Sequence, residues 1–140
     1  MRLTGVNLPL WSELPDFGLY MDQVMTCVER VFAGFPMEAL TPGMVNSYVK
    51  SGLVDRPAGK KYSRAALSQL LMVCLLKQTS SLDILRRLLH PEGLSAEEVY
   101  SAFRADLGAV SSALSAGSTP LEAALRAAAW QQLCRELLEA

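Results

Sequence analysis

Apolar residues recur every three or four positions along much of the chain, which is the spacing of helices that bury one face. This pattern predicts helices over residues 20–32, 41–51, 64–77, 80–89, 95–114 and 120–138. The third of these is apolar on all sides over residues 70–76, so we expect it at the centre of the core. The alternation typical of strands is confined to a short hairpin in the loop at 55–64. The predicted fold class is therefore all-α.

The segment from Thr41 to Ser63 carries the most informative local signals. Thr41 is a candidate N-cap, and Pro42 follows it at the first helical position, where its missing N–H is no loss. Gly52 comes after the last polar turn and can adopt the left-handed conformation that ends a helix. Turn residues fill the loop that follows, and Ser63 is the candidate N-cap of the next helix. These signals predict a short helix followed by a tight loop, here called the wing (residues 55–64).

The last three predicted helices each begin with a hydroxyl residue and an acid three positions later, which predicts N-caps at Ser80, Ser95 and Thr119. A break after the fourth helix divides the chain into two parts. We expect residues 1–92 to form an N-terminal arm (residues 1–19) and a helical core, and residues 93–140 to form a two-helix C-terminal segment. The turn at 116–119 is short, so we expect the two C-terminal helices to form an antiparallel hairpin.

The fifth predicted helix carries a seam of apolar residues at alternating spacings of four and three. Such a seam favours pairing with another helix. Two arrangements remain open: the C-terminal helices form a homodimer, or they pack onto the core of their own chain. The residues predicted to mediate dimerisation are Tyr100, Phe103, Leu107, Val110 and Leu114, together with the sixth helix.

Composition and candidate chemistry exclude several classes of protein. Of the 140 residues, 51% are hydrophobic and 19% are charged, which is typical of a folded chain rather than a disordered one. The longest apolar run, residues 70–76, is too short to span a bilayer, and the N-terminus does not resemble a signal peptide, so we expect a cytoplasmic protein without a membrane partner. The three cysteines lack the spacing of metal ligands, and we interpret them as core residues. Because the motifs of common enzymes are absent, we expect neither an enzyme nor a bound metal or cofactor.

Positive charge is concentrated in one segment. The whole chain has a net charge of −1, but residues 41–64 hold five basic residues and a single acid, a net charge of +4. Residues 1–40 and 65–140 are both net acidic. A local basic segment of this kind either forms a solvated loop or neutralises phosphate.

The helix predicted over 42–51 has two chemically different faces. Val45, Tyr48 and Val49 group on one side, whereas the other side is short, polar and cationic, which suits insertion into a major groove. Asn46 is suited to a bidentate contact with adenine, and lysines here and in the wing are suited to neutralise phosphate. The candidate DNA-binding residues are Gly43, Asn46, Ser47, Tyr48, Lys50, Arg56, Lys60, Lys61 and Arg64.

Residues 44–54, with an aromatic at Tyr48 and the Gly52-Leu53 pair, together with residues 60–63, resemble the recognition helix and wing of MerR-type regulators. The chain also resembles a bacterial domain family of unknown function, through residues 19–24, 40–50, 60–62 and 76–78. The first resemblance spans about residues 41–90 and the second about 8–90. The MerR resemblance implies a winged helix-turn-helix core that binds double-stranded DNA as a dimer.

The sequence thus supports two hypotheses. In the first, the chain is a DNA-binding transcriptional regulator that reads the major groove with the 42–51 helix and contacts phosphates with the wing. In the second, it is a protein-interaction module that kept the winged-helix scaffold and lost DNA binding. The second rests on the acidic balance outside residues 41–64, the short wing and the apolar C-terminal helices.

Overall fold

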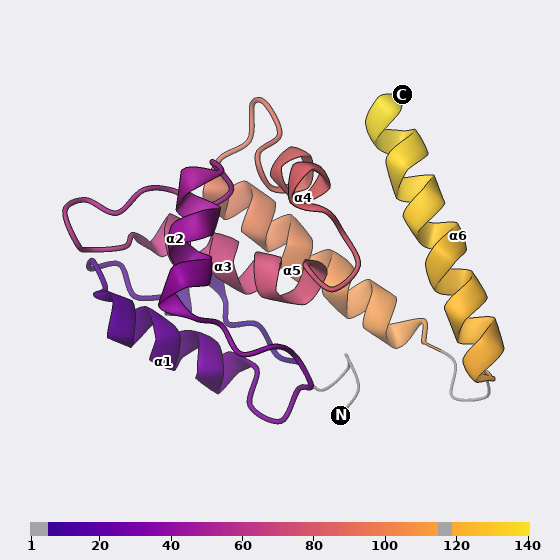
Figure 1. Ribbon diagram of the computed structural model, residues 1–140, viewed down its shortest axis with the longest axis horizontal. Coiled ribbons are helices and arrows are strands. Elements are labelled where there is room, and N and C mark those ends of the chain that lie inside the picture. Colours follow the sequence, from indigo (N-terminus) through magenta and orange to yellow (C-terminus); the bar gives the residue numbers. More distant parts are fainter. Residues whose placement is uncertain (1–5, 115–118) are drawn as a thin grey trace.

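The computed structural model describes residues 6–114 and 119–140. Within these ranges the chain folds into α-helices joined by loops, with two isolated β-bridges and no longer strand (Figure 1). The prediction of an all-α protein is confirmed. The elements are the 3₁₀ helix η2 (Trp11–Glu13) and the helices α1 (Met21–Val31), α2 (Pro42–Lys50), α3 (Arg64–Leu76), α4 (Leu82–Leu89), α5 (Ala96–Ser112) and α6 (Pro120–Glu139).

Helix α3 lies at the centre of the core, as its apolar sequence predicted. Every residue from 66 to 74 is buried, and α3 packs against α1, α4 and α5. Two polar side chains, Ser68 and Gln69, are buried with the apolar ones. Ser68 is satisfied locally, because its hydroxyl donates to the Ala65 carbonyl at 2.7 Å. Gln69 makes its hydrogen bond outside the helix, to the start of the wing.

Helix α2 begins and ends as its local signals predicted. The Thr41 hydroxyl accepts a hydrogen bond from the Met44 amide at 3.2 Å, and Pro42 occupies the first helical position. Gly52 has a φ of 78°, and the amide of Leu53 donates back to the Tyr48 carbonyl at 3.0 Å. This is the left-handed stop that glycine permits at a helix C-terminus. The predicted start and end of this short helix are therefore confirmed.

The tip of the wing is a two-residue turn. Ala58 and Lys61 exchange backbone hydrogen bonds of 2.9 and 3.1 Å, and Gly59 between them has the positive φ of 62° that a type II′ turn requires at its first central position. The wing is also joined to the N-terminal arm, because Leu19 and Tyr62 exchange backbone hydrogen bonds of 2.9 and 2.7 Å. The predicted hairpin is thus short and is paired with a distant segment.

The predicted caps of the later helices are correct within one residue. Ser95 and Glu98 form a reciprocal capping box at α5, and the Thr119 hydroxyl accepts from the Glu122 amide at 3.1 Å. At α4 the cap is Ser81, whose hydroxyl accepts from the Ile84 amide at 3.3 Å, and not Ser80. The acid three positions after Ser80 therefore pointed to the wrong one of two adjacent serines, since either hydroxyl is able to cap a helix.

The first half of α5 belongs to the core, which corrects the predicted dimerisation surface. Tyr100 is fully buried, its hydroxyl donates to the Pro9 carbonyl at 2.7 Å, and its ring centroid lies 6.1 Å from that of Trp11. Phe103 and Leu107 are partly buried against the same core. These three side chains pack within their own chain, because the N-terminal arm and η2 lie along α5. Only the last two residues of the predicted set, Val110 and Leu114, are exposed, at 54% and 53%.

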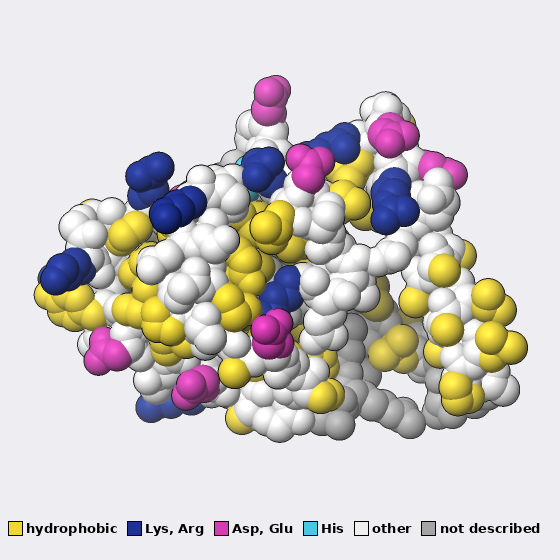
Figure 2. Space-filling view, in the orientation of Figure 1, with side chains coloured by type: hydrophobic (Ala, Val, Ile, Leu, Met, Phe, Trp, Pro, Cys, Tyr) yellow, Lys and Arg dark blue, Asp and Glu magenta, His cyan; other side chains and the backbone are white. Residues whose placement is uncertain are grey.

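The expected helical hairpin of α5 and α6 is wrong. Helix α6 stands beside the body of the molecule, which is formed by the arm and α1 to α5, instead of packing along α5 (Figure 1). None of its side chains is fully buried. Among the described residues, hydrogen bonds between α6 and the rest of the molecule run from Gln131 to the Thr79 carbonyl and from Arg87 to the Leu138 carbonyl. Of the predicted turn at 116–119, residues 116–118 lie outside the described residues. Figure 2 shows apolar side chains exposed along the lower part of α6, and the large exposed apolar residues of this helix are Leu121, Leu125, Trp130, Leu133 and Leu137.

A membrane is crossed by helices that are both long and apolar. None of the helices in residues 6–114 and 119–140 is both long enough and apolar enough to cross a membrane.

Candidate nucleic-acid interface

Helix α2 separates buried and exposed side chains along its length. Val45 is fully buried, whereas the predicted reading face, formed by Gly43, Asn46, Ser47 and Lys50, is exposed. The placement of Tyr48 among the predicted DNA-binding residues is corrected by the structure. Its side chain is only 7% exposed and belongs to the core, and burial raises the pKa of its hydroxyl. Tyr48 therefore holds α2 on the body rather than facing solvent.

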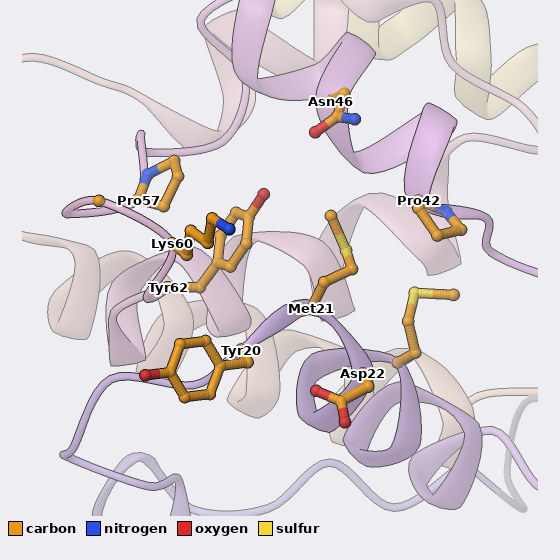
Figure 3. A pocket seen from close by; sticks show the side chains of 10 residues that line it. Tyr20, Met21, Asp22, Pro42, Asn46, Pro57, Lys60 and Tyr62 are labelled. Carbon is orange, nitrogen blue, oxygen red and sulfur yellow. The ribbon is translucent and has the colours of Figure 1, made fainter.

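Two adjoining hollows lie between α2, the wing and the start of α1. The larger has a volume of about 890 Å³, with Met21 and Met25 of α1 in its wall (Figure 3). The smaller, about 420 Å³, lies toward the C-terminal end of α2. Asn46 and Tyr62 line both hollows. In Figure 3 the Asn46 amide points from α2 toward the space above Tyr62 and Lys60. The exposed face of α2 and the wing thus border one continuous groove.

The basic residues of the 41–64 segment divide into two groups. Lys60 lines the larger hollow, and Lys50 and Arg56 line the smaller one. Figure 2 shows Lys and Arg side chains gathered over the wing and the adjoining end of α2. These three cations therefore surround the groove that holds Asn46.

The other two predicted basic residues face the N-terminal arm. The Lys61 ammonium lies 5.6 Å from the centroid of the Tyr20 ring. The Arg64 guanidinium lies 5.6 Å from the centroid of the Trp11 ring, and one of its nitrogens is 3.9 Å from the Asp16 carboxylate. Because that carboxylate is exposed, the ion pair adds little stability, and the cation–π contact with Trp11 is the second interaction that joins Arg64 to the arm. Lys61 and Arg64 thus join the wing to the arm instead of completing the groove.

The root of the wing is held by residues that sequence reasoning did not identify as part of the site. The buried Gln69 of α3 accepts a hydrogen bond from the Asp55 amide at 2.8 Å through its side-chain oxygen. At the other end of the wing, a Cβ atom on Gly18 would lie 2.6 Å from that of Lys61, so only glycine permits this close approach of arm and wing. A polar residue inside the apolar stretch of α3 was the available signal for Gln69.

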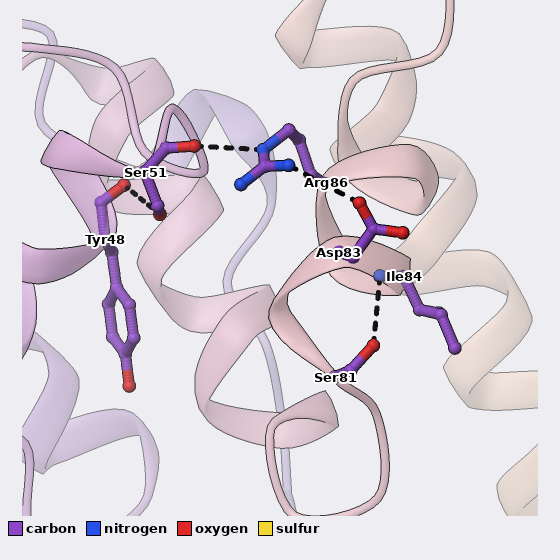
Figure 4. A network of polar contacts seen from close by, with 6 residues as sticks. All are labelled: Tyr48, Ser51, Ser81, Asp83, Ile84 and Arg86. Atoms are coloured by element: carbon purple, nitrogen blue, oxygen red, sulfur yellow. Dashed lines mark hydrogen bonds and ion pairs between the residues drawn. The ribbon is translucent and has the colours of Figure 1, made fainter.

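The C-terminal end of α2 is held from α4. The Nε of Arg86 donates to the Ser51 carbonyl at 2.9 Å, and Nε2 of His90 donates to the Leu53 carbonyl at 2.7 Å (Figure 4 shows the first contact). A nitrogen of Arg86 is also 3.5 Å from the Asp83 carboxylate one turn earlier. The sequence pattern placed Arg86 outside the core and His90 at the end of its helix, without indicating this contact.

The described residues outside the groove offer little reactive chemistry. They contain no cluster of three or more His, Cys, Asp or Glu side chains that is able to hold a metal ion. The cysteines Cys27, Cys74 and Cys134 are unpaired. Burial raises the pKa of the Cys74 thiol to about 11, so this thiol is protonated at neutral pH. The exposed polar and basic side chains of α2 and the wing are instead gathered around the groove.

Comparison with known proteins gives one match. The sequence model of a family described as "Domain of unknown function (DUF1836)" matches residues 9–103. The matched region contains the arm from residue 9 onward, α1 to α4 and α5 up to Phe103, and it ends before the exposed Val110. No curated protein and no solved structure matches the chain.

Proposed function

The chain belongs to the DUF1836 family, and we propose that this member is a DNA-binding transcriptional regulator with a MerR-like winged helix-turn-helix. The observation that carries the proposal is the shared groove. Asn46 of α2 lines both adjoining hollows. Lys60 of the wing lines the larger one, and Lys50 of α2 and Arg56 of the wing line the smaller one. Base-reading and phosphate-neutralising groups are therefore available on one surface.

Each side chain has a role that follows from its chemistry. Helix α2 enters the major groove, where Asn46 makes a bidentate contact with adenine and Ser47 a less selective one. Lys50, Arg56 and Lys60 neutralise phosphates and set the register without reading sequence. Gly43 at the start of α2 lets the backbone approach closely, since little surrounds its Cα. Lys61 and Arg64 contribute indirectly by keeping the wing against the arm.

Regulators of this kind bind as dimers whose reading helices lie about 34 Å, or a multiple of it, apart along the duplex. The exposed apolar residues of the chain support a homodimer: Val110 and Leu114 of α5, and the apolar face of α6. A cytoplasmic location accompanies this proposal.

Selection of binding sites from a random duplex library, at about 50 mM and about 200 mM salt, tests the proposal. We expect affinity to fall steeply with salt. Lys50→Ala, Arg56→Ala and Lys60→Ala should each reduce the magnitude of the slope of log K against log salt by about 1. Asn46→Ala should leave the slope unchanged and relax the preference at one base pair, by about 1–3 kcal/mol.

Arg30→Ala is the matched control, because Arg30 is an exposed cation on α1, in the last turn and outside the residues that line the groove. It should change neither the slope nor the preference. Binding that is absent at low salt, or insensitive to salt, would contradict the proposal.

A second candidate function, a protein-interaction module that has lost DNA binding, is favoured by the exposed apolar side chains of α6. Trp130 is 68% exposed and Leu137 66%. Capture of a stoichiometric protein partner from nuclease-treated native lysate, lost in a Trp130→Ser, Leu137→Ser variant, would support it. Sequence-selective DNA binding by the wild-type protein and by this variant would exclude the second candidate function.

A further inference from the structure

We infer that Arg86 and His90 of α4 are positioning residues that hold the C-terminal end of α2, and so set how α2 meets DNA. This inference rests on the proposed function for its DNA readout, but the contacts themselves belong to the free protein. Neither residue lines the groove, and both act through the backbone of the α2 terminus.

The need for such contacts follows from the size of α2. It has nine residues, fewer than an isolated helix needs to persist in water. Val45 and Tyr48 fix the buried side of the helix. Lys50, by contrast, is exposed and lies in the last turn, next to the Gly52 stop. The end of α2 is therefore held by the buried side chains of Leu53 and Val54 beyond it, and by the groups that bind the carbonyls on either side of Gly52.

The last carbonyls of a helix have no partner within the helix, and cations are favoured beside them. Arg86 donates to the Ser51 carbonyl at the C-cap of α2, and His90 donates to the Leu53 carbonyl just beyond Gly52. The two donors are four residues apart, so they lie on the same side of α4. The Asp83 carboxylate orients Arg86 from one turn earlier (Figure 4). Together they bind the carbonyls on either side of the glycine stop.

The neighbouring Arg87 provides a matched comparison. It is also exposed and lies in the last turn of α4, but it donates to the Leu138 carbonyl at the end of α6. Adjacent arginines thus bind the C-terminal ends of two different helices. Removing Arg87 deletes the same charge from the same turn and leaves α2 untouched.

The experiment compares Arg86→Leu, Arg86→Lys, His90→Leu and His90→Gln with Arg87→Leu. Amide hydrogen exchange in the free protein directly measures how strongly the C-terminal end of α2 is stabilised. At residues 51–54, exchange should accelerate about tenfold in Arg86→Leu and His90→Leu, as expected for loss of one hydrogen bond of about 1.4 kcal/mol. His90→Gln, which keeps a side-chain N–H donor, should restore much of the protection. Arg87→Leu should leave residues 51–54 at the wild-type rate.

The affinity for DNA and its dependence on salt then show whether Arg86 positions α2 or contacts phosphate directly. Arg86→Leu should weaken binding to the selected duplex about tenfold with the salt slope unchanged, and Arg86→Lys should also weaken binding, although it keeps the charge. A slope reduced by about 1 in Arg86→Leu, with full affinity in Arg86→Lys, would show a phosphate contact and overturn the inference.

Unchanged exchange at residues 51–54 in both leucine variants would also overturn it. If Arg86→Leu fails to fold, Arg86→Lys and the two His90 variants carry the same comparison. If the wild-type protein binds no duplex, the proposed function fails, and the exchange measurement alone decides whether Arg86 and His90 hold α2.

Discussion

At the scale of single residues, the most constrained positions are those where the backbone conformation or the burial of the side chain requires one residue type. Gly52 has a φ of 78°, and a Cβ atom placed there would meet nothing within 4 Å. Its requirement for glycine is therefore conformational and not steric. Tyr100 has the opposite character, because its ring is enclosed and its hydroxyl is committed to the Pro9 carbonyl.

Gly52→Ala should reduce the free energy of unfolding by about 1–2 kcal/mol, the cost of a left-handed conformation for an L-residue. Urea denaturation measures this change. Gly108→Ala is the control, because Gly108 lies inside α5 with open space around it, and alanine there should stabilise the protein by about 0.5–1 kcal/mol. Equal effects of the two substitutions would contradict the assigned conformation of Gly52.

Stability should fall in alkaline solution because of buried groups that resist ionisation. Burial, partly opposed by Arg104, raises the pKa of Tyr100 from 10.0 to about 12, and burial raises that of Cys74 from 9.0 to about 11. Between these values the unfolded chain has lost protons that the native state still holds, so the free energy of unfolding decreases as pH rises. The contribution is complete below pH 9 and is lost through about pH 12.

Urea denaturation across this range should show a shallower decline for Tyr100→Phe above pH 10. The same variant should be less stable at neutral pH, because the Pro9 carbonyl loses its donor. A Tyr100→Phe curve parallel to that of the wild type would contradict the role of this hydroxyl.

At the scale of elements, the wing is held at both ends by segments distant in sequence. Gln69 of α3 binds its first amide, and the arm pairs with Tyr62 at its exit. A loop this short has few contacts of its own, so its orientation beside α2 depends on these anchors. The groove that carries Asn46 and Lys60 therefore depends on residues that do not line it.

Gln69→Leu should cost about 1–3 kcal/mol, because it leaves the Asp55 amide without its side-chain acceptor. Hydrogen exchange at Asp55 should accelerate more than exchange at Tyr62, whose partner is Leu19. Gln78→Leu, an exposed glutamine just after α3, is the control and should change both values little. Equal exchange at Asp55 in the two variants would argue against the anchor.

At the scale of the whole molecule, the body and α6 are organised differently. One core joins the arm, α1 to α4 and the first half of α5, whereas α6 exposes its apolar side chains. A helix stabilised by few tertiary contacts adds little to the body that it touches.

Removal of residues 119–140 should therefore lower the free energy of unfolding of the body by less than about 2 kcal/mol, since it deletes two hydrogen bonds at exposed sites. Urea denaturation of the truncated protein, with circular dichroism to follow the helices, provides the measurement. A truncated chain that fails to fold would show that α6 supports the core.

The sequence by itself determined the features that depend on neighbours along the chain. The helix caps at Thr41, Ser63 and Ser95 and the glycine stop at Gly52 follow from hydrogen bonds over three to five residues, and they appear where the sequence predicted them. The centrality of α3 also followed from its pattern alone, because a helix that is apolar on all sides must be enclosed.

Only the tertiary structure decided which surfaces the elements share. The apolar seam of α5 is compatible with a partner chain or with its own core, and contact with Pro9, 91 residues away from Tyr100, selected the core. The basic residues of the wing have the same charge in sequence, yet Lys60 lines the same hollow as Asn46, whereas Lys61 lies over the ring of Tyr20 and Arg64 over that of Trp11. Local hydrogen bonding and periodicity are encoded by adjacent residues, whereas pairing between distant segments depends on the fit of the whole core.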